Sequence, residues 1–538
     1  MTAAPAPTRF TEWPPIAVGL IAVAIAAALV VVSDAASALH RPLWLDEIFT
    51  QLIAQSPRGV LRALRSGADF QPPLDYFLVR LSDRLTPPGS ALTARLPSLV
   101  AIAGSVCLLG AMLRTRLSTA AALAGALALA AHPLAISFAA EARPYALWIF
   151  TTALTAGCLS LNRRGAALLV VAAAAAVCSS HYFGVLSIVS MGFAVGAYAK
   201  FSRRLSWPAT ARTVAPLAIG ACALLALLPL ARAQLAASGG RSWMSPRTAG
   251  DFAVFLRWIW GWRPAWMLIA AGACFMAARR IPSLASRLPR ATRVEFDATL
   301  VALLATAAVP LLVALITLLY KPVLVLRYSA PAVLAVATLC ALAVEMLPRQ
   351  VRWLPLLLLG RSALHSYASV AATARNETAV YADDAQAVRL LAANGIRTMA
   401  PSRHDAYRAS WPAGGASAVA WMELSDSLLE RVATVPGASC TRSCMLVERD
   451  FGRAVKREFG FPEVVSAEAA RTTGSVALLR DESDSGADTL LFPARIACTL
   501  SSRLAVYMLP AAAVPCDSMR AVIQSGGSLG IRRLTGNW

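Results

Sequence analysis

Acidic residues are scarce over the first two thirds of this sequence. Residues 1–372 contain 12 Asp and Glu against 32 Lys and Arg, whereas residues 373–538 are nearly balanced, with 17 acidic and 18 basic side chains. A basic surplus can indicate nucleic-acid binding. Here the Arg residues gather at the ends of long apolar runs, which is typical of membrane topology. We therefore predict no nucleic-acid partner.

The sequence contains many long runs without any charged residue. The chain is 57% hydrophobic and its mean hydropathy is +0.59. A membrane-spanning helix needs about 20 mostly apolar residues, and by this rule we predict about eleven spans. They are 13–33, 96–113, 117–140, 144–162, two within 165–199, 213–231, 264–278, 298–320, 328–344 and 353–373. This pattern predicts a polytopic α-helical membrane protein with a soluble appendage.

Basic residues in alternate loops predict the orientation, because cytoplasmic loops carry an excess of Lys and Arg. These loops contain Arg114/Arg116, Arg163/Arg164, Lys200/Arg203/Arg204/Arg212, Arg279/Arg280/Arg287/Arg290/Arg293 and Arg349/Arg352. The N-terminus is then cytoplasmic, and an odd number of spans places the C-terminal part outside. We predict a membrane domain over 1–373 and an extracytoplasmic mixed α/β domain over 374–538, in a bacterial inner membrane.

The first external loop, 34–95, is long and has the pattern of two amphipathic helices. Ser56-Pro57 is a helix start, and Gly67 ends that helix. The apolar spacing over 72–85 predicts a second helix. Arg residues on an external loop run against the positive-inside bias, and anionic lipid headgroups at the outer leaflet would explain them.

The C-terminal part holds four of the ten cysteines, Cys440, Cys444, Cys498 and Cys516. An even number fits one or two disulfides in an oxidising compartment, with three possible pairings. The pair at 440 and 444 is alternatively half of a metal site. Helices are expected at 385–394 and 425–432, and strands at 416–421, 444–447 and 475–479. We find no nucleotide-binding loop, catalytic triad or repeat there, which favours a docking or acceptor-recognition module over a second enzyme.

Asp46 and Glu47 are the most informative residues of the chain. Two adjacent carboxylates beside a membrane are energetically expensive, and such residues are usually functional. Neighbouring residues do not point in the same direction on either a helix or a strand, so the two carboxylates should have different tasks. Asp46 can act as a catalytic base, while Glu47 holds the loop or a metal ion. The alternative is a solvated loop or a helix cap.

Further candidates lie at the predicted outer ends of spans. Glu141 and Arg143 either pair with each other, or bind a sugar hydroxyl and a phosphate respectively. Lys321 is the only Lys in the predicted external loops of the membrane domain and is followed by Arg327 and Tyr328. These cations suit phosphate binding, or snorkelling at the membrane interface.

His181 lies at an external turn between two spans. It is either a hydrogen-bonded turn residue or a ligand-binding residue. A divalent metal held by Glu47 and His181 is possible, although no spacing in the sequence demands a cofactor.

Five short motifs follow one another along the chain in a recognisable order. They are Trp44-Leu45-Asp46-Glu47, Gln71-Pro72-Pro73-Leu74-Asp75-Tyr76-Phe77, Ala94-Arg95-Leu96-Pro97-Ser98, Glu141-Ala142-Arg143-Pro144-Tyr145 and Leu326-Arg327-Tyr328. With these motifs the sequence resembles the GT-C superfamily of membrane glycosyltransferases, and is most similar to its protein O-mannosyltransferase-like and lipid A aminoarabinose transferase-like branch. The resemblance covers roughly 10–350.

This resemblance implies an inverting transfer of a sugar from a polyprenyl-phosphate carrier to an acceptor hydroxyl on a lipid, glycan or protein. It implies that Asp46 is the catalytic base. We further predict that the phosphate or the sugar of the donor is bound by Gln71, Glu141, Arg143, Tyr145, His181, Lys321, Arg327 and Tyr328. The aminoarabinose enzymes have a phosphate-binding Lys just before the first Pro of the second motif, where this chain has Gln71. Phosphate contacts must then come from other residues.

Two other functions remain open. A lipid or sugar transporter usually carries ionisable residues inside its spans, and Arg361 is the one such charge here. A structural or sensory membrane protein would leave the outer motifs without a task. Loss of Asp46 should affect a transferase more than a flippase.

Overall fold

The structure is a computed structural model that describes residues 13–85, 90–161, 165–237, 248–281 and 294–393, together with six short strands between 397 and 507. The chain divides into two compact units. The first comprises 1–40, 71–228 and 247–373, and the second comprises 41–70, 229–246 and 374–538. The first-loop segment 41–70 therefore belongs to the same unit as the C-terminal part.

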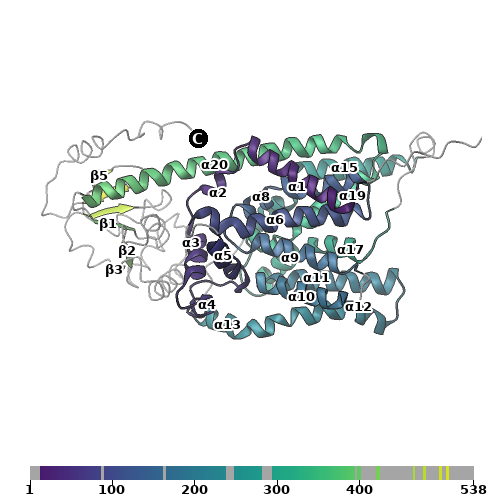
Figure 1. Cartoon of the computed structure of the whole chain (residues 1–538), viewed down its shortest axis with the longest axis horizontal. Coiled ribbons are helices and arrows are strands. Elements are labelled where there is room, and N and C mark those ends of the chain that lie inside the picture. The colour runs from purple at the N-terminus through teal and green to yellow at the C-terminus, as the bar shows by residue number, and fades with distance from the viewer. Residues whose placement is uncertain are drawn as a thin grey trace, which may run out of the picture. The chain divides into compact units, whose positions relative to one another are not determined.

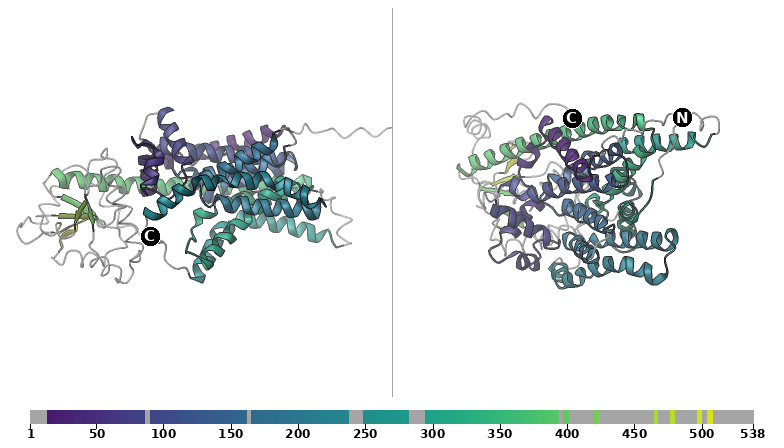
Figure 2. Two further views of the ribbon diagram at one scale, coloured as in Figure 1. Left: turned by 90° about the horizontal axis from the view of Figure 1, so that it is seen from below. Right: turned by 45° about the vertical axis from the view of Figure 1, so that its right-hand side comes forward.

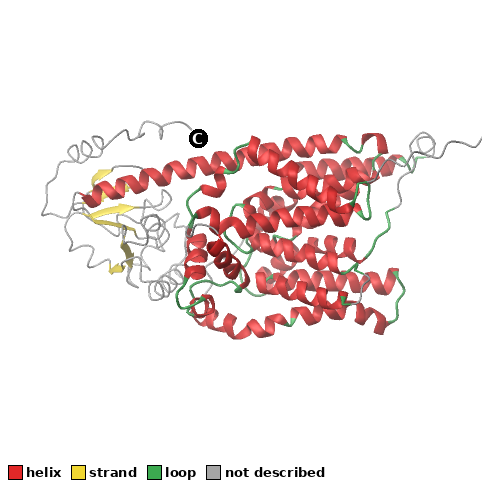
Figure 3. Ribbon diagram, in the orientation of Figure 1, coloured by secondary structure: helices red, strands yellow, loops and turns green. Residues whose placement is uncertain are grey.

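Helices account for nearly all of the described chain up to residue 393 (Figure 3). The first group is α1 Pro15–Val32, α2 Ser37–His40, α3 Leu45–Gln55, α4 Val60–Arg65, α5 Leu74–Leu85, α6 Ala91–Arg114, α7 Thr119–Ala131, α8 Pro133–Ala139, α9 Tyr145–Cys158 and α10 Ala166–Ser180. The second group is α11 Gly184–Ala197, the π-helix η1 Tyr198–Ser202, α12 Trp207–Ala221, α13 Ala223–Ala237, α14 Ala249–Trp260 and α15 Arg263–Ala278. The last group is α17 Ala298–Ala305, η2 Thr306–Ala308, α18 Val309–Leu319, η3 Leu326–Ser329, α19 Ala332–Met346, η4 Arg349–Val351 and α20 Leu354–Ala393.

Among the described residues, five helices are long and apolar enough to cross a membrane. They are Pro15–Val32, Ala91–Arg114, Gly184–Ser202, Trp207–Ala237 and Ala298–Leu319. A sixth is formed if α7 and α8, bent by 61° at His132, count as one span. Four shorter apolar helices accompany them: α9, α10, α15 and α19. The protein is a polytopic helical membrane protein, as predicted, and the number eleven stays a prediction.

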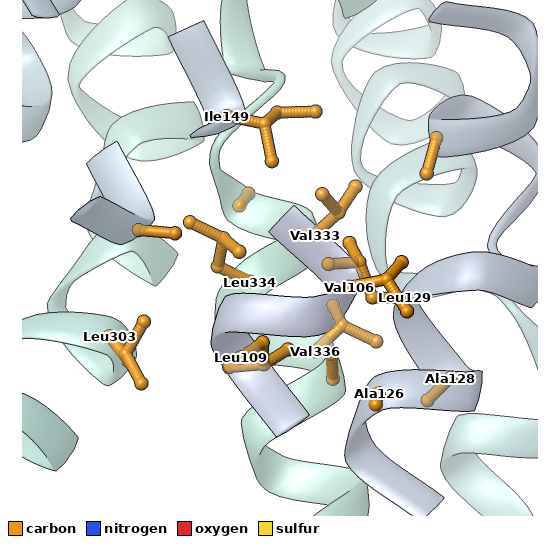
Figure 4. Packing of buried hydrophobic residues seen from close by; sticks show 14 of the residues in the cluster. Val106, Leu109, Ala126, Ala128, Leu129, Ile149, Leu303, Val333, Leu334 and Val336 are labelled. Atoms are coloured by element: carbon orange, nitrogen blue, oxygen red, sulfur yellow. The ribbon is translucent and has the colours of Figure 1, made fainter. Parts of the chain in front are cut away.

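The core of the first unit lies where α6, α7, α9 and α19 pack together (Figure 4). Helix α7 is buried along nearly its whole length, because eleven of its thirteen residues are Ala or Leu and α6 and α19 pack closely against it. Helices α10, α11 and α12 lie side by side next to this core (Figures 1 and 2).

Helices α1 and α6 approach each other closely where they cross. A Cβ atom on Gly19 would collide with the backbone carbonyl of Cys107, and one on Gly110 would lie 3.0 Å from the Cα of Gly19. Small residues let two apolar helices approach at backbone distance, and the packing energy of a membrane interface depends on this approach.

One end of the core carries a buried ion pair. The Arg352 guanidinium lies 2.8 Å from the Glu345 carboxylate, and the two side chains are 6% and 2% exposed. The backbone N–H and hydroxyl of Ser118, at the start of α7, donate to the second oxygen of the same carboxylate. The pair thus ties the ends of α7 and α19 to the loop that follows α19.

The first external loop, 34–95, contains the four helices α2 to α5, two more than the sequence predicted. Helix α4 begins at Val60, after Gly59 with φ +92°, and not at Pro57 as expected. Helix α5 exposes Phe77, Leu81 and Leu85 in one stripe. Helix α3 was not predicted, because 45–55 is too short and polar for the span rule.

A six-stranded sheet is described in the C-terminal part of the chain. Its order is β3-β2-β1-β4-β6-β5; β1 to β4 pair in parallel, and β6 is antiparallel to both β4 and β5. The strands are β1 Arg397–Ala400, β2 Ala420–Glu423, β3 Val464–Ser466, β4 Val476–Leu479, β5 Ile496–Thr499 and β6 Leu504–Tyr507.

Two predictions for this part meet the described residues. The helix expected at 385–394 is the last part of α20, which runs without interruption from the last predicted span. The strand expected at 475–479 corresponds to β4, whereas the one expected at 416–421 overlaps β2 only at residues 420 and 421. The segments 425–432 and 444–447 and the side chains of Cys440, Cys444, Cys498 and Cys516 lie outside what the structure describes.

Candidate active site

The two first-loop carboxylates lie in the first turn of α3, within the second unit. Trp44 is the N-cap residue, and the Glu47 carboxylate accepts a hydrogen bond from its backbone N–H at 3.1 Å. This is half of a capping box, which satisfies one of the free donors at a helix start. Glu47 is fully buried, whereas Asp46 is half-buried. The two carboxylates thus have different surroundings.

The second unit also fixes the start of this segment. The Arg41 guanidinium lies 2.9 Å from the Glu377 carboxylate of α20. The pair is partly exposed, so its contribution to stability is small. It nevertheless joins two points that are 336 residues apart in the sequence.

In the first unit, four predicted site residues gather around the turn between α10 and α11. The His181 ring centroid lies 5.7 Å from that of Tyr145 and 5.4 Å from that of Tyr328. The Arg327 guanidinium lies 5.9 Å from the centroid of the Tyr145 ring, a cation–π contact. These residues come from the start of α9, from the α10–α11 turn and from η3.

Two aromatic side chains that the sequence analysis missed complete the cluster. The Trp148 ring is stacked on His181 at 4.6 Å with an interplanar angle of 2°, and Phe183 lies 5.8 Å from His181. Trp148 follows Tyr145 by three residues on α9. This spacing puts two side chains on the same helix face and was the available signal. The Trp148 indole N–H donates to the Ser187 hydroxyl at 3.1 Å, which fixes the ring.

Two positive charges act on the buried His181. Burial and the nearby guanidinium groups of Arg143 and Arg327 together lower the pKa of His181 to about 3. His181 is 1% exposed and Arg143 is 3% exposed. The imidazole is therefore neutral at physiological pH, and the charge of the cluster comes from the two arginines. Such a site favours an anion with several oxygen atoms.

The remaining predicted residues lie at separate points of the first unit. The Glu141 carboxylate accepts a hydrogen bond from the Ser137 hydroxyl at 3.0 Å. Gln71 is buried just before α5, and Lys321 is half-buried just after α18.

The third motif has a structural task. Arg95 is fully buried, and its guanidinium donates to the backbone carbonyls of Ala38 and Leu39, both at 3.1 Å. Ser98 donates to the backbone carbonyl of Arg143 at 3.2 Å. The motif thereby connects α6 to the chain before the first loop and to the start of α9.

Within the described part of the chain, no group of three or more His, Cys, Asp or Glu side chains is placed to hold a metal ion. Of the two possible ligands named from the sequence, Glu47 caps the start of α3, and His181 lies among aromatic rings.

Comparison with known proteins relates the fold of the chain to solved structures of ArnT. The sequence matches no protein-family model and no curated protein sequence. The structure is similar to that of ArnT from Cupriavidus metallidurans in the apo state, with a TM-score of 0.56 and 15% identity over 90% of this chain and 97% of ArnT. It is also similar to ArnT from the same organism bound to undecaprenyl phosphate, with a TM-score of 0.54 and 14% identity over 92% and 99% of the two chains. The protein thus has the fold of ArnT over most of its length, and the predicted resemblance to GT-C membrane glycosyltransferases is confirmed at the level of the fold.

Proposed function

We propose that the chain is an inverting glycosyltransferase that moves a sugar from a polyprenyl-phosphate donor to an acceptor hydroxyl. The observation that carries the proposal is the pair of cations, buried Arg143 and half-buried Arg327, beside a buried and aromatic-lined His181. A fold shared with ArnT, one structure of which contains undecaprenyl phosphate, supports a polyprenyl-phosphate ligand for these cations.

In the proposed reaction, Asp46 takes the proton of the acceptor hydroxyl. The acceptor oxygen then attacks the anomeric carbon, and the bond from that carbon to the phosphate oxygen breaks with inversion. The phosphate leaves with the electron pair, and the guanidinium groups of Arg143 and Arg327 stabilise the charge that develops on it. Glu47 holds the first turn of α3 through its bond to Trp44, which positions Asp46.

The proposal extends to the residues whose surroundings are less specific. Tyr145 and Tyr328 line the donor site beside His181, and Glu141 binds a sugar hydroxyl. Lys321 and Gln71 contribute to phosphate and donor binding. The reaction takes place at the outer face of a bacterial inner membrane, with the N-terminus in the cytoplasm and residues 374–538 outside.

The exposed apolar stripe of α5 supports a position against lipid. Phe77, Leu81 and Leu85 are 44%, 50% and 75% exposed, while the opposite side of the helix packs on α6. An amphipathic helix with an exposed apolar stripe lies well in the headgroup region of a bilayer.

The test is mass spectrometry of polyprenyl-phosphate sugars in a deletion strain. The strain is complemented with the wild type or with Asp46→Asn at matched protein levels. We expect one glycolipid to build up in the deletion strain, to fall with the wild type and to stay high with Asp46→Asn. If Asp46→Asn restores the wild-type profile, the catalytic role of Asp46 is wrong and a transporter becomes the better hypothesis.

A further inference from the structure

The imidazole of His181 has one satisfied nitrogen and one that is not. Its Nδ1 accepts a hydrogen bond from the backbone N–H of Phe183 at 3.1 Å. Its Nε2 is buried and has no hydrogen-bond partner among the residues that the structure describes. Buried polar groups are nearly always paired, because an unpaired one has lost its bonds to water without compensation. This nitrogen therefore points to a ligand.

The bond to Phe183 decides which kind of atom that ligand must present. Nδ1 uses its lone pair as an acceptor, so the single proton of the neutral ring is on Nε2. The ring remains neutral because burial and the two nearby guanidinium groups lower its pKa to about 3. Nε2 is thus a donor, and its partner must be an acceptor.

The direction of this N–H is fixed before any ligand binds. The ring is stacked on Trp148, whose own N–H is bonded to Ser187, and Tyr145, Tyr328 and Phe183 lie around its other sides. A group that is already immobile loses little conformational freedom on binding.

The charges around His181 indicate an anionic acceptor. Arg143 and Arg327 both act on the ring electrostatically. A sugar hydroxyl would gain little from these cations, whereas an oxygen of a phosphate gains both their attraction and a charge-assisted hydrogen bond. With the proposed function as its basis, we infer that the Nε2–H of His181 donates to a phosphate oxygen of the polyprenyl-phosphate donor, as a neutral third contact beside Arg143 and Arg327.

A neutral donor has a consequence for turnover. The donor phosphodiester carries one negative charge, and the polyprenyl phosphate that leaves carries up to two. A third cation would bind this product more tightly than it binds the donor. His181 instead adds a hydrogen bond without adding charge, which limits product inhibition.

The test is binding of undecaprenyl phosphate to the full-length protein in nanodiscs, with undecaprenol and inorganic phosphate as comparison probes. His181→Phe keeps a flat ring on Trp148 but loses the donor, and His181→Gln restores an N–H at a similar reach. His365→Phe, at an exposed position of α20, is the matched control. We expect His181→Phe to weaken binding about 10- to 100-fold. We expect His181→Gln to bind within a few fold of the wild type, and undecaprenol and inorganic phosphate to bind far more weakly than the lipid phosphate.

A second measurement is read out on the wild type. Nitrogen-15 NMR of the wild type, labelled at its five histidines and assigned with His181→Gln, reports the tautomer directly. We expect a neutral Nε2–H form at pH 6 whose Nε2–H signal moves downfield when undecaprenyl phosphate is added.

The outcomes separate the inference from the proposed function. If the wild type does not bind undecaprenyl phosphate, the proposed function itself fails. If it binds and His181→Phe binds equally well, or if the proton is on Nδ1, only the role of His181 is overturned. Equal affinity for inorganic phosphate would overturn the assignment to a lipid phosphate.

Discussion

Loss of the buried ion pair between Glu345 and Arg352 should destabilise the membrane domain strongly. Arg352→Met removes a guanidinium that lies 2.8 Å from the carboxylate and donates to the backbone carbonyls of Glu345 at 2.6 Å and Leu347 at 2.9 Å. The carboxylate then stays buried, and among the described residues it keeps the hydrogen bonds from Ser118 to its other oxygen. Breaking one side of a buried pair costs about 3–5 kcal/mol, and we expect a loss in this range.

The double variant Glu345→Met/Arg352→Met distinguishes the cost of an unpaired buried carboxylate from the cost of the other lost contacts. It removes both charges, so no unpaired carboxylate remains, and its main cost is the lost acceptor at the start of α7, about 1 kcal/mol. We expect it to be more stable than Arg352→Met alone. The assay is equilibrium unfolding in mild detergent titrated with SDS, followed by circular dichroism. Equal stability of Arg352→Met and the wild type, or a double variant less stable than the single one, would refute this account of the network.

Three further predictions concern the donor site and the helix packing. Arg143→Gln should weaken undecaprenyl-phosphate binding about 10-fold and reduce the dependence of this binding on salt, because a charge-assisted contact is lost. Arg84→Gln, on the exposed side of α5, should change neither the affinity nor its salt dependence. Equal effects of the two substitutions would contradict the role of Arg143 in phosphate binding. Gly19→Ala should lower the free energy of unfolding by about 1–3 kcal/mol through overpacking against α6, whereas Gly360→Ala, where nothing lies within 4 Å of an added Cβ, should not. The folded-state pKa of His181 lies below its unfolded value of about 6.5, so its contribution to stability is complete above pH 6.5 and is lost as the pH falls towards 3. The stability difference between the wild type and His181→Phe should shrink by about 2 kcal/mol between pH 7 and pH 5, and a difference independent of pH would show that folding does not lower the pKa of His181.

The membrane helices could be predicted because their signal is local. The charge-free runs 13–33, 96–113 and 298–320 correspond to the described spans Pro15–Val32, Ala91–Arg114 and Ala298–Leu319. Each run is long enough to be identified from its own residues. Charged residues are rare in the hydrocarbon core of a bilayer, so the first charged residues on either side mark the ends of each run.

The surroundings of His181 could not be predicted from the same evidence. Tyr145, His181 and Tyr328 were each identified as candidates, but nothing in the local sequence shows that three positions so far apart share one cluster. Trp148 was missed because a Trp in an apolar helix usually serves packing. Helix α3 was missed because its start depends on one bond, from Trp44 to Glu47.

The central claim is tested most directly with the purified protein and its own donor. The glycolipid that accumulates in the deletion strain is extracted and given, with an envelope acceptor fraction, to the wild type and to Asp46→Asn in nanodiscs, and free polyprenyl phosphate is measured by mass spectrometry. We predict that the wild type releases polyprenyl phosphate as the sugar appears on the acceptor, and that Asp46→Asn releases little or none. Donor left intact by a folded wild type, or equal release by both proteins, would contradict the claim.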